Sequence, residues 1–303
     1  MNDSPSKKNN HHTNSSSAPS LLEHPDGTTL VLIPEGEFLA GGAGSVVRME
    51  KAGMEKPFHV HLPAYYLSKY AVTNAQYKRF VDETGHRAPP APPRKFKRGH
   101  WKEVPVEPNH PVQRVSKKDA DAYCAWAGLR LPTELEWEKG ARGVDGRMYP
   151  WGNTWNPRRC RNNLNDRNLD TCAVDRYPLG KSPWGLYQMA GNTFEWCSDE
   201  YEFDAYARYQ HGPLTSSNPD DIKHPDMRLW VVRGGSYLMD SGARVLAISE
   251  ESIVEQMSGE TYLIERPKED YEGTEPFRCG FRMALPAGTF AWFSMGFRCA
   301  KDI

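Results

Sequence analysis

This sequence of 303 residues lacks several features that identify particular classes of protein. It has no apolar run near the roughly 18 residues that a membrane-spanning helix needs. The segment after Met1 is polar and holds no apolar core of a secretory signal. Its 39 acidic and 38 basic residues nearly balance, which gives no reason to expect nucleic acid or an anionic membrane as the main partner. We therefore expect a cytoplasmic protein that binds neither nucleic acid nor a membrane.

Cysteine motifs are missing as well. The chain has six cysteines, but none forms Cys-x-x-Cys and no paired spacing indicates a zinc site. In a reducing cytoplasm we expect most of them to be free thiols. They are Cys124, Cys160, Cys172, Cys197, Cys279 and Cys299.

Glycine, proline and aromatic residues are plentiful instead. The chain has 25 Gly, 24 Pro, 14 Tyr and 9 Trp, which is typical of a loop-rich globule rather than a helical bundle. No repeat with a period of 20–50 residues is present, so a solenoid is excluded. We interpret the polar residues 1–26 as a disordered tail. Residues 27–303 form one predicted domain, near the upper length limit for a single hydrophobic core.

Three capping boxes predict helix starts in the first half of the chain. A Thr or Ser is followed three residues later by Gln, Asp or Glu in Thr73–Gln76, Ser116–Asp119 and Thr133–Glu136. Glycine or a breaker segment follows each helix, so the predicted helices end at Gly85, Gly128 and Arg142.

Short strands are predicted from β-branched and alternating apolar residues. The Pro-rich, basic segment 88–111 is interpreted as a long surface loop. Two or three helices among many short strands and long loops indicate an α+β fold. The predicted strands cover residues 28–34, 35–42, 59–62, 229–237, 279–284 and 295–300.

The aromatic stretch from Trp184 to Asp199 is the most informative part of the chain. Within it, Glu195 lies between Phe194 and Trp196. An unpaired charge buried between two rings would cost several kcal/mol, so this carboxylate needs a cation. The residues alone leave an arginine and a metal ion open.

A second candidate metal region precedes this stretch. Residues 151–174 show almost no periodicity and are crowded with Asn and Asp. Many side-chain oxygens in a long irregular segment suit a hard cation such as calcium. Ordinary turn chemistry, which also favours Asn and Asp, explains the same composition.

Short sequence motifs, in the order in which they occur along this chain, resemble those of the sulfatase-modifying-factor family, which includes the formylglycine-generating enzymes. The likeness covers residues 28–303 and implies an elaborated C-type-lectin-like fold, loop-rich with short strands and two or three helices. The matching phrases include Ile33–Phe38, Val72–Tyr77, Ala122–Trp126, Arg130–Glu138, Tyr149–Asn153, Gly185–Tyr187, Gly191-Asn192, Glu195-Trp196, Arg233–Ser236 and Gly296–Cys299.

The resemblance also implies calcium as a cofactor. One implied site uses Asn163, Leu164 through its carbonyl, Asp166 and Asn168. A second uses the carbonyls of Gln188, Gly191 and Thr193 together with the carboxylate of Glu195. Sets of oxygen ligands are what calcium requires.

The family's cysteine chemistry fits this sequence less well. Formylglycine-generating enzymes hold Cu(I) with two cysteines shortly after Arg-Gly-Gly-Ser, because Cu(I) needs soft thiolate ligands. Here the segment 237–278 contains no cysteine. Relatives that form sulfur–carbon bonds bind iron through an additional helical domain that is not found in this sequence. The resemblance further implies that Cys124 and Cys299 are either a disulfide or reduced neighbours.

Three functions remain open, and we predict no catalytic residue. The first is a module that binds a protein, a peptide or a small-molecule ligand without copper chemistry. The second is a variable protein of a diversity-generating retroelement, since residues around Trp292 are reachable from Asn codons by adenine mutation. The third is an oxidoreductase with an unrecognised metal site that uses His59, His61 or Cys279.

The predicted binding face comprises Tyr237, Leu238, Met239, Phe290, Trp292 and Phe293.

Overall fold

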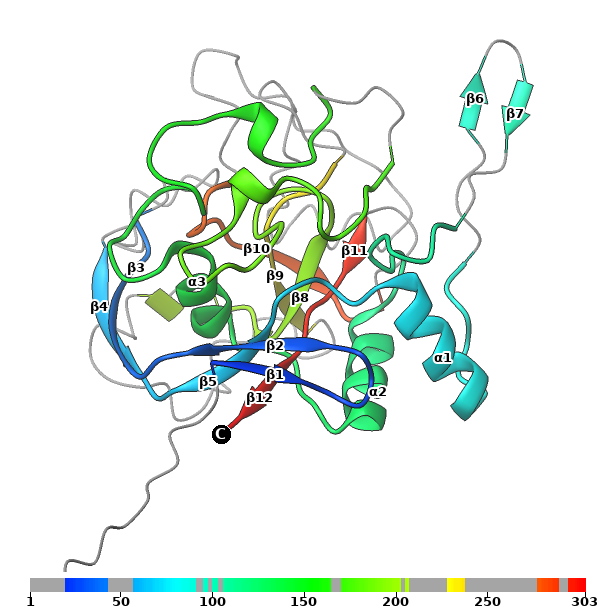
Figure 1. Cartoon of the computed structure of the whole chain (residues 1–303), viewed down its shortest axis with the longest axis horizontal. Coiled ribbons are helices and arrows are strands. Elements are labelled where there is room, and N and C mark those ends of the chain that lie inside the picture. The colour runs from blue at the N-terminus through cyan, green and yellow to red at the C-terminus, as the bar shows by residue number, and fades with distance from the viewer. Residues whose placement is uncertain are drawn as a thin grey trace, which may run out of the picture.

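Short strands carry most of the regular structure, as seen in a computed structural model of the chain (Figure 1). Three α-helices lie beside two four-stranded sheets in the part of the chain that the model describes. That part comprises residues 20–42, 57–90, 95–97, 100–102, 106–164, 170–202, 205–206, 228–237, 277–288 and 294–303.

The first sheet joins the two ends of the domain. Its strand order is β1-β2-β5-β12 and all three pairings are antiparallel. Ala300 of the last strand pairs with Leu67, and both are fully buried. The final residues therefore belong to the core of the domain. The strands are β1 (Leu21–Glu23), β2 (Thr29–Ile33), β5 (Tyr65–Ser68) and β12 (Ala300–Asp302).

The second sheet holds the aromatic stretch at its centre. In the order β10-β9-β8-β11, β8 pairs antiparallel with β9 and parallel with β11. Glu195 lies opposite Arg233, and Phe194 lies opposite Met295. The strands are β8 (Phe194–Glu200), β9 (Leu229–Arg233), β10 (Met283–Pro286) and β11 (Met295–Gly296).

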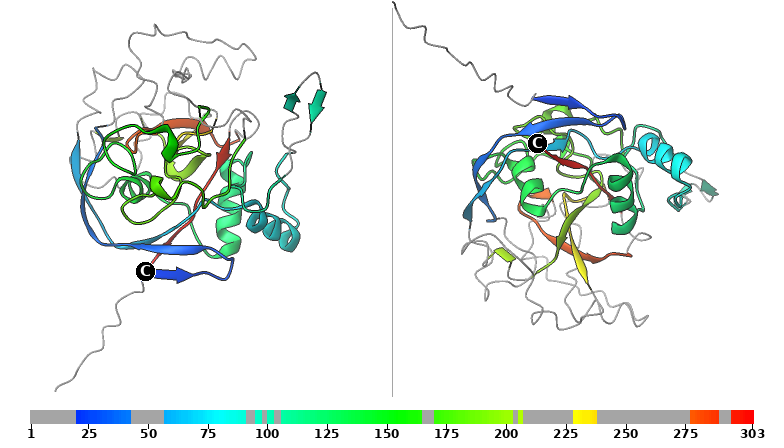
Figure 2. Two further views of the ribbon diagram at one scale, coloured as in Figure 1. Left: turned by 45° about the horizontal axis from the view of Figure 1, so that its top comes forward. Right: turned by 90° about the horizontal axis from the view of Figure 1, so that it is seen from below.

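Two hairpins complete the strands. β3 pairs with β4 beside the first sheet, and β6 pairs with β7 in a hairpin that stands out from the body (Figures 1 and 2). The hairpin β6–β7 lies within the segment 88–111, so the prediction of a continuous loop there was wrong. The strands are β3 (Gly36–Ala40), β4 (Phe58–Leu62), β6 (Lys95–Lys97) and β7 (His100–Lys102).

All three capping boxes are confirmed. α1 (Asn74–Thr84), α2 (Lys117–Ala127) and α3 (Glu134–Arg142) each have the predicted N-cap and both reciprocal hydrogen bonds. The first two end at glycines in the left-handed conformation, because an L side chain at that φ is strained. Two short 3-10 helices, η1 (Pro157–Arg159) and η2 (Pro178–Gly180), lie in the irregular middle.

The predicted boundaries differ from the structure in several places. The strand predicted at 229–237 ends at Arg233, and the one predicted at 295–300 is two strands, β11 and β12, in different sheets. Residues 20–26 belong to the fold rather than to a disordered tail, because β1 pairs with β2 and Asp26 is buried against Tyr123. Residues 1–19 lie outside the described residues. The strand predicted at 279–284 begins only at Met283, since the preceding carbonyls serve a buried arginine.

Helices long and apolar enough to span a bilayer are not found among the described residues.

Candidate functional site

Glu195 is paired with an arginine from the end of the chain. Its carboxylate accepts from Nε of Arg298 at 2.6 Å and from Nη2 at 2.8 Å. Trp137 adds an indole N–H at 2.6 Å. Both charged side chains are buried, so each neutralises the other away from water. Sequence reasoning left an arginine open but did not identify Arg298.

This pair bears directly on the second predicted calcium set. The oxygens of Glu195 already accept three N–H donors, and a divalent cation there would lie beside a buried guanidinium. Gln188, Gly191 and Thr193 lie on the buried segment that leads into β8. The carboxylate of this set is already neutralised by Arg298. Calcium at this position stays a prediction.

Only two of the four residues in the first predicted calcium set lie among the described residues. Asn163 and Leu164 form a turn in which the amide of Leu164 donates to Oδ1 of Asn162 at 2.9 Å, and Leu164 is exposed. Asp166 and Asn168 lie outside the described residues. This set also stays a prediction.

Asn192 connects the segment before β8 with four residues from other parts of the chain. Its side chain accepts from the amide of Cys172 at 2.9 Å and donates to the carbonyl of Cys172 at 3.1 Å. Its own carbonyl accepts from the amide of Tyr237 and from the hydroxyl of Ser294, each at 3.1 Å. Its amide donates to the carbonyl of Arg161. We define this group of five residues as the Asn192 junction.

The Asn192 junction depends on backbone that only certain residues adopt. Asn192 has a φ of 68°, a left-handed conformation that asparagine tolerates better than most residues. The neighbouring Gly191 has a φ of 80°, and a Cβ there would lie 2.2 Å from the carbonyl oxygen of Arg161. The phrase Gly191-Asn192 was the sequence signal for this junction, although sequence reasoning gave it no such role.

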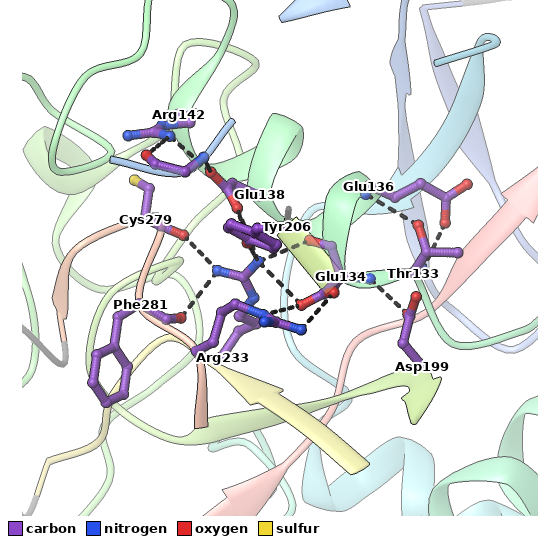
Figure 3. Close-up of polar contacts among 12 residues, drawn as sticks. Thr133, Glu134, Glu136, Glu138, Arg142, Asp199, Tyr206, Arg233, Cys279 and Phe281 are labelled. Carbon is purple, nitrogen blue, oxygen red and sulfur yellow. Dashed lines mark hydrogen bonds and ion pairs between the residues drawn. The ribbon is translucent and has the colours of Figure 1, made fainter. Parts of the chain in front are cut away.

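Arg233 of the Arg-Gly-Gly-Ser phrase is fully buried and its guanidinium contacts several segments of the core (Figure 3). Its Nη1 donates to the carbonyls of Cys279 and Phe281, and its Nη2 donates to Glu138 at 2.9 Å and to the hydroxyl of Tyr206. Burial raises the pKa of Glu138, but Arg233 and Arg142 outweigh it and the net pKa is lowered. This network fixes the segment that contains Cys279.

None of the cysteines forms a disulfide. Cys172, at the Asn192 junction, is partly exposed, and the other five are buried. Burial raises the pKa of Cys160 and of Cys279 to about 12, and it also raises the pKa of Cys197 well above its ordinary value. The sulfurs of Cys124 and Cys299 are 3.7 Å apart, which fits reduced neighbours.

The remaining predicted residues are only partly described. Tyr237 is buried at 7% exposure, so it does not form part of an exposed face. Burial and Asp170 raise its pKa to about 12. His59 and His61 are exposed on β4, and no group of three or more His, Cys, Asp or Glu that could hold a metal is found among the described residues. Leu238, Met239, Phe290, Trp292 and Phe293 lie outside the described residues.

The sequence of this chain is similar to proteins of a known family. The family model of the sulfatase-modifying factor enzyme 1-like domain matches residues 16–303. The formylglycine-generating enzyme of Streptomyces coelicolor is 36% identical over 261 residues, covering 69% of this chain and 78% of that enzyme. Hercynine oxygenase of Mycolicibacterium smegmatis is 31% identical over 251 residues, covering 71% of this chain and 55% of that enzyme.

Solved structures share the fold at lower identity. PvdO from Pseudomonas aeruginosa superposes with a TM-score of 0.63 at 19% identity, covering 95% of this chain and all of that chain. Treponema denticola variable protein 1 has a TM-score of 0.56 at 17% identity, covering 94% and 100%. These likenesses confirm the predicted α+β, C-type-lectin-like fold.

Proposed function

The chain belongs to the family of sulfatase-modifying factor enzyme 1-like domains, and from this premise we propose that it is a binding module without copper-dependent oxidase chemistry. Its ligand is a protein, a peptide or a small molecule. The position of the six cysteines is the observation that carries the proposal.

Cu(I) chemistry of the family type requires two thiolates close together after Arg-Gly-Gly-Ser. Residues 237–278 contain no cysteine. Cys279 is the next one along, but it is fully buried with a pKa raised to about 12, so it remains a thiol near neutral pH. Its carbonyl is fixed by Arg233. These facts support a core role for Cys279.

The proposal is tested by titrating the full chain with Cu(I) against a competing chelator. We expect no stoichiometric tight site, and the same result for Cys279→Ser. Tight one-to-one binding that Cys279→Ser abolishes would overturn the proposal and support the oxidoreductase interpretation.

The predicted binding face remains part of the proposal, although Tyr237 is excluded from its exposed surface by burial. Its other members are Leu238, Met239, Phe290, Trp292 and Phe293. Large apolar residues held at a surface mark recognition sites. The variable-protein alternative is supported by the shared fold alone, and a near-repeat of the 3′ end beside a reverse transcriptase gene would decide for it.

We also propose that the protein binds calcium and that it is located in the cytoplasm. A ligand that binds only the folded chain raises stability by mass action. We expect EGTA to lower the Tm and added calcium, but not magnesium, to restore it. An unchanged Tm in EGTA would contradict both calcium sets. The reduced pair Cys124 and Cys299 supports a reducing compartment.

A further inference from the structure

Two lysines and two tyrosines gather on the surface at the end of β5. Lys69 and Tyr70 directly follow β5, whereas Lys181 and Tyr187 come from the segment between η2 and β8. Lys181 is exposed and the other three are partly exposed. We call these four residues the lysine–tyrosine patch.

Both ammonium groups are held at the same ring. The rings of Tyr70 and Tyr187 have centroids 5.0 Å apart. Nζ of Lys69 lies 5.3 Å from the centroid of Tyr70 and 5.8 Å from that of Tyr187, and Nζ of Lys181 lies 5.4 Å from that of Tyr187. Cation–π attraction favours each contact. It leaves the N–H donors of both lysines available.

The polar groups of the patch lack partners within the described part of the chain. Neither ammonium forms an ion pair or hydrogen bond there, and neither phenol hydroxyl forms a hydrogen bond. The exposed Lys78 behaves differently, since it pairs with Asp82 at 2.6 Å. Two uncompensated cations at one ring repel each other, and an anion would relieve that repulsion.

The backbone beneath the patch is fixed. The amide of Tyr187 donates to the carbonyl of Lys69 at 2.9 Å, and the amide of Lys69 donates to the carbonyl of Thr29 at 2.8 Å. The carbonyl of Tyr187 accepts from Nη2 of Arg298 at 3.0 Å. Because Arg298 is itself held by Glu195, the patch is anchored to the core and is preorganised for a ligand.

We propose that the lysine–tyrosine patch binds a tetrahedral oxyanion, the phosphate or sulfate ester group of a ligand. A planar carboxylate is best matched by the fork of an arginine, whereas an ammonium is a compact point charge with three rotatable donors. Two ammonium groups and two hydroxyls suit the several acceptor oxygens of a phosphate or sulfate. This site is independent of the face proposed above.

The full chain is titrated with sodium phosphate, sodium sulfate and sodium chloride at equal ionic strength, with amide NMR shifts and calorimetry as readouts. We expect saturable shifts at Tyr187 with phosphate, sulfate or both, and none with chloride. Lys69→Gln and Lys181→Gln should each weaken binding about tenfold, because each removes a charged hydrogen-bond donor. Lys118→Gln is the matched control, since Lys118 is exposed on α2 and has no such rings.

Tyr70→Phe keeps the ring and removes one hydroxyl, so it should weaken binding without changing the Tm. Saturation by phosphate alone assigns a phosphate ester, and saturation by sulfate alone assigns a sulfate ester. The proposal is overturned if neither anion saturates at millimolar concentration. It is equally overturned if Lys118→Gln weakens binding as much as Lys69→Gln does.

Discussion

Glu195 and Arg298 form the buried ion pair at the centre of the molecule, 103 positions apart in sequence. The flanking rings predicted that Glu195 needs a cation, and the structure places a guanidinium there. The choice of Arg298 follows from the parallel pairing of β11 with β8. No local pattern in the sequence encodes a pairing between such distant segments, so the partner could not be named in advance.

Glu195→Gln should cost about 3–5 kcal/mol of unfolding free energy, because it leaves the guanidinium of Arg298 buried without a counter-charge. Glu83→Gln is the control, since Glu83 forms an exposed pair with Arg79 whose loss should cost at most about 1 kcal/mol. Urea unfolding of both variants measures the difference. Equal costs would show that the central pair does not stabilise the fold.

Asp199 makes stability depend on pH. Partial burial and the neighbouring Glu134 raise its pKa to about 7 from an ordinary value near 3.8. The folded state therefore holds this proton more tightly than the unfolded state, and the resulting stability is present below pH 4 and is lost as pH rises through 7.

Asp199→Asn removes this titration and keeps an acceptor for the amide of Glu134. Between pH 5 and 8 the unfolding free energy of the wild type should fall by about 2–3 kcal/mol more than that of the variant. Urea unfolding across this range tests the difference. Parallel curves for the two proteins would rule out Asp199 as the titrating group.

At the scale of elements, local signals were sufficient for helices and insufficient for several strands. The capping boxes at Thr73, Ser116 and Thr133 placed every N-cap correctly, because a cap is built from residues within one turn. β5 and β8 were not predicted as separate strands. Their aromatic side chains are buried in long-range pairings, so neither shows the alternation of a half-buried strand.

Substitution of Gly191 tests how closely the segment before β8 packs against Arg161 in the Asn192 junction. Gly191→Ala should lower the unfolding free energy by at least about 3 kcal/mol, because the residue has a positive φ and its Cβ would meet the carbonyl of Arg161. Gly288→Ala, where a Cβ meets nothing within 4 Å, should change it by about 0.5 kcal/mol or less. A similar small effect for both variants would contradict the tight packing described here.

For the whole molecule, ordered phrases predicted the family and its fold over almost the full domain. The same phrases did not predict the chemistry, because function depends on residues that lie between them. The Arg-Gly-Gly-Ser phrase illustrates the difference. Its arginine supports the core through Glu138 and the Cys279 segment, while the cysteine pair that would give copper chemistry is missing from the residues after it.

The most direct test of this account is aldehyde formation on a peptide that contains Cys-x-Pro-x-Arg. The full chain is supplied with Cu(I), oxygen and a thiol reductant, and the formylglycine-generating enzyme of Streptomyces coelicolor serves as positive control. Mass spectrometry follows conversion of the peptide cysteine to the aldehyde. We predict conversion by the control enzyme and none by this protein. Multiple turnovers by this protein would contradict the claim that it has the family's fold without its copper chemistry.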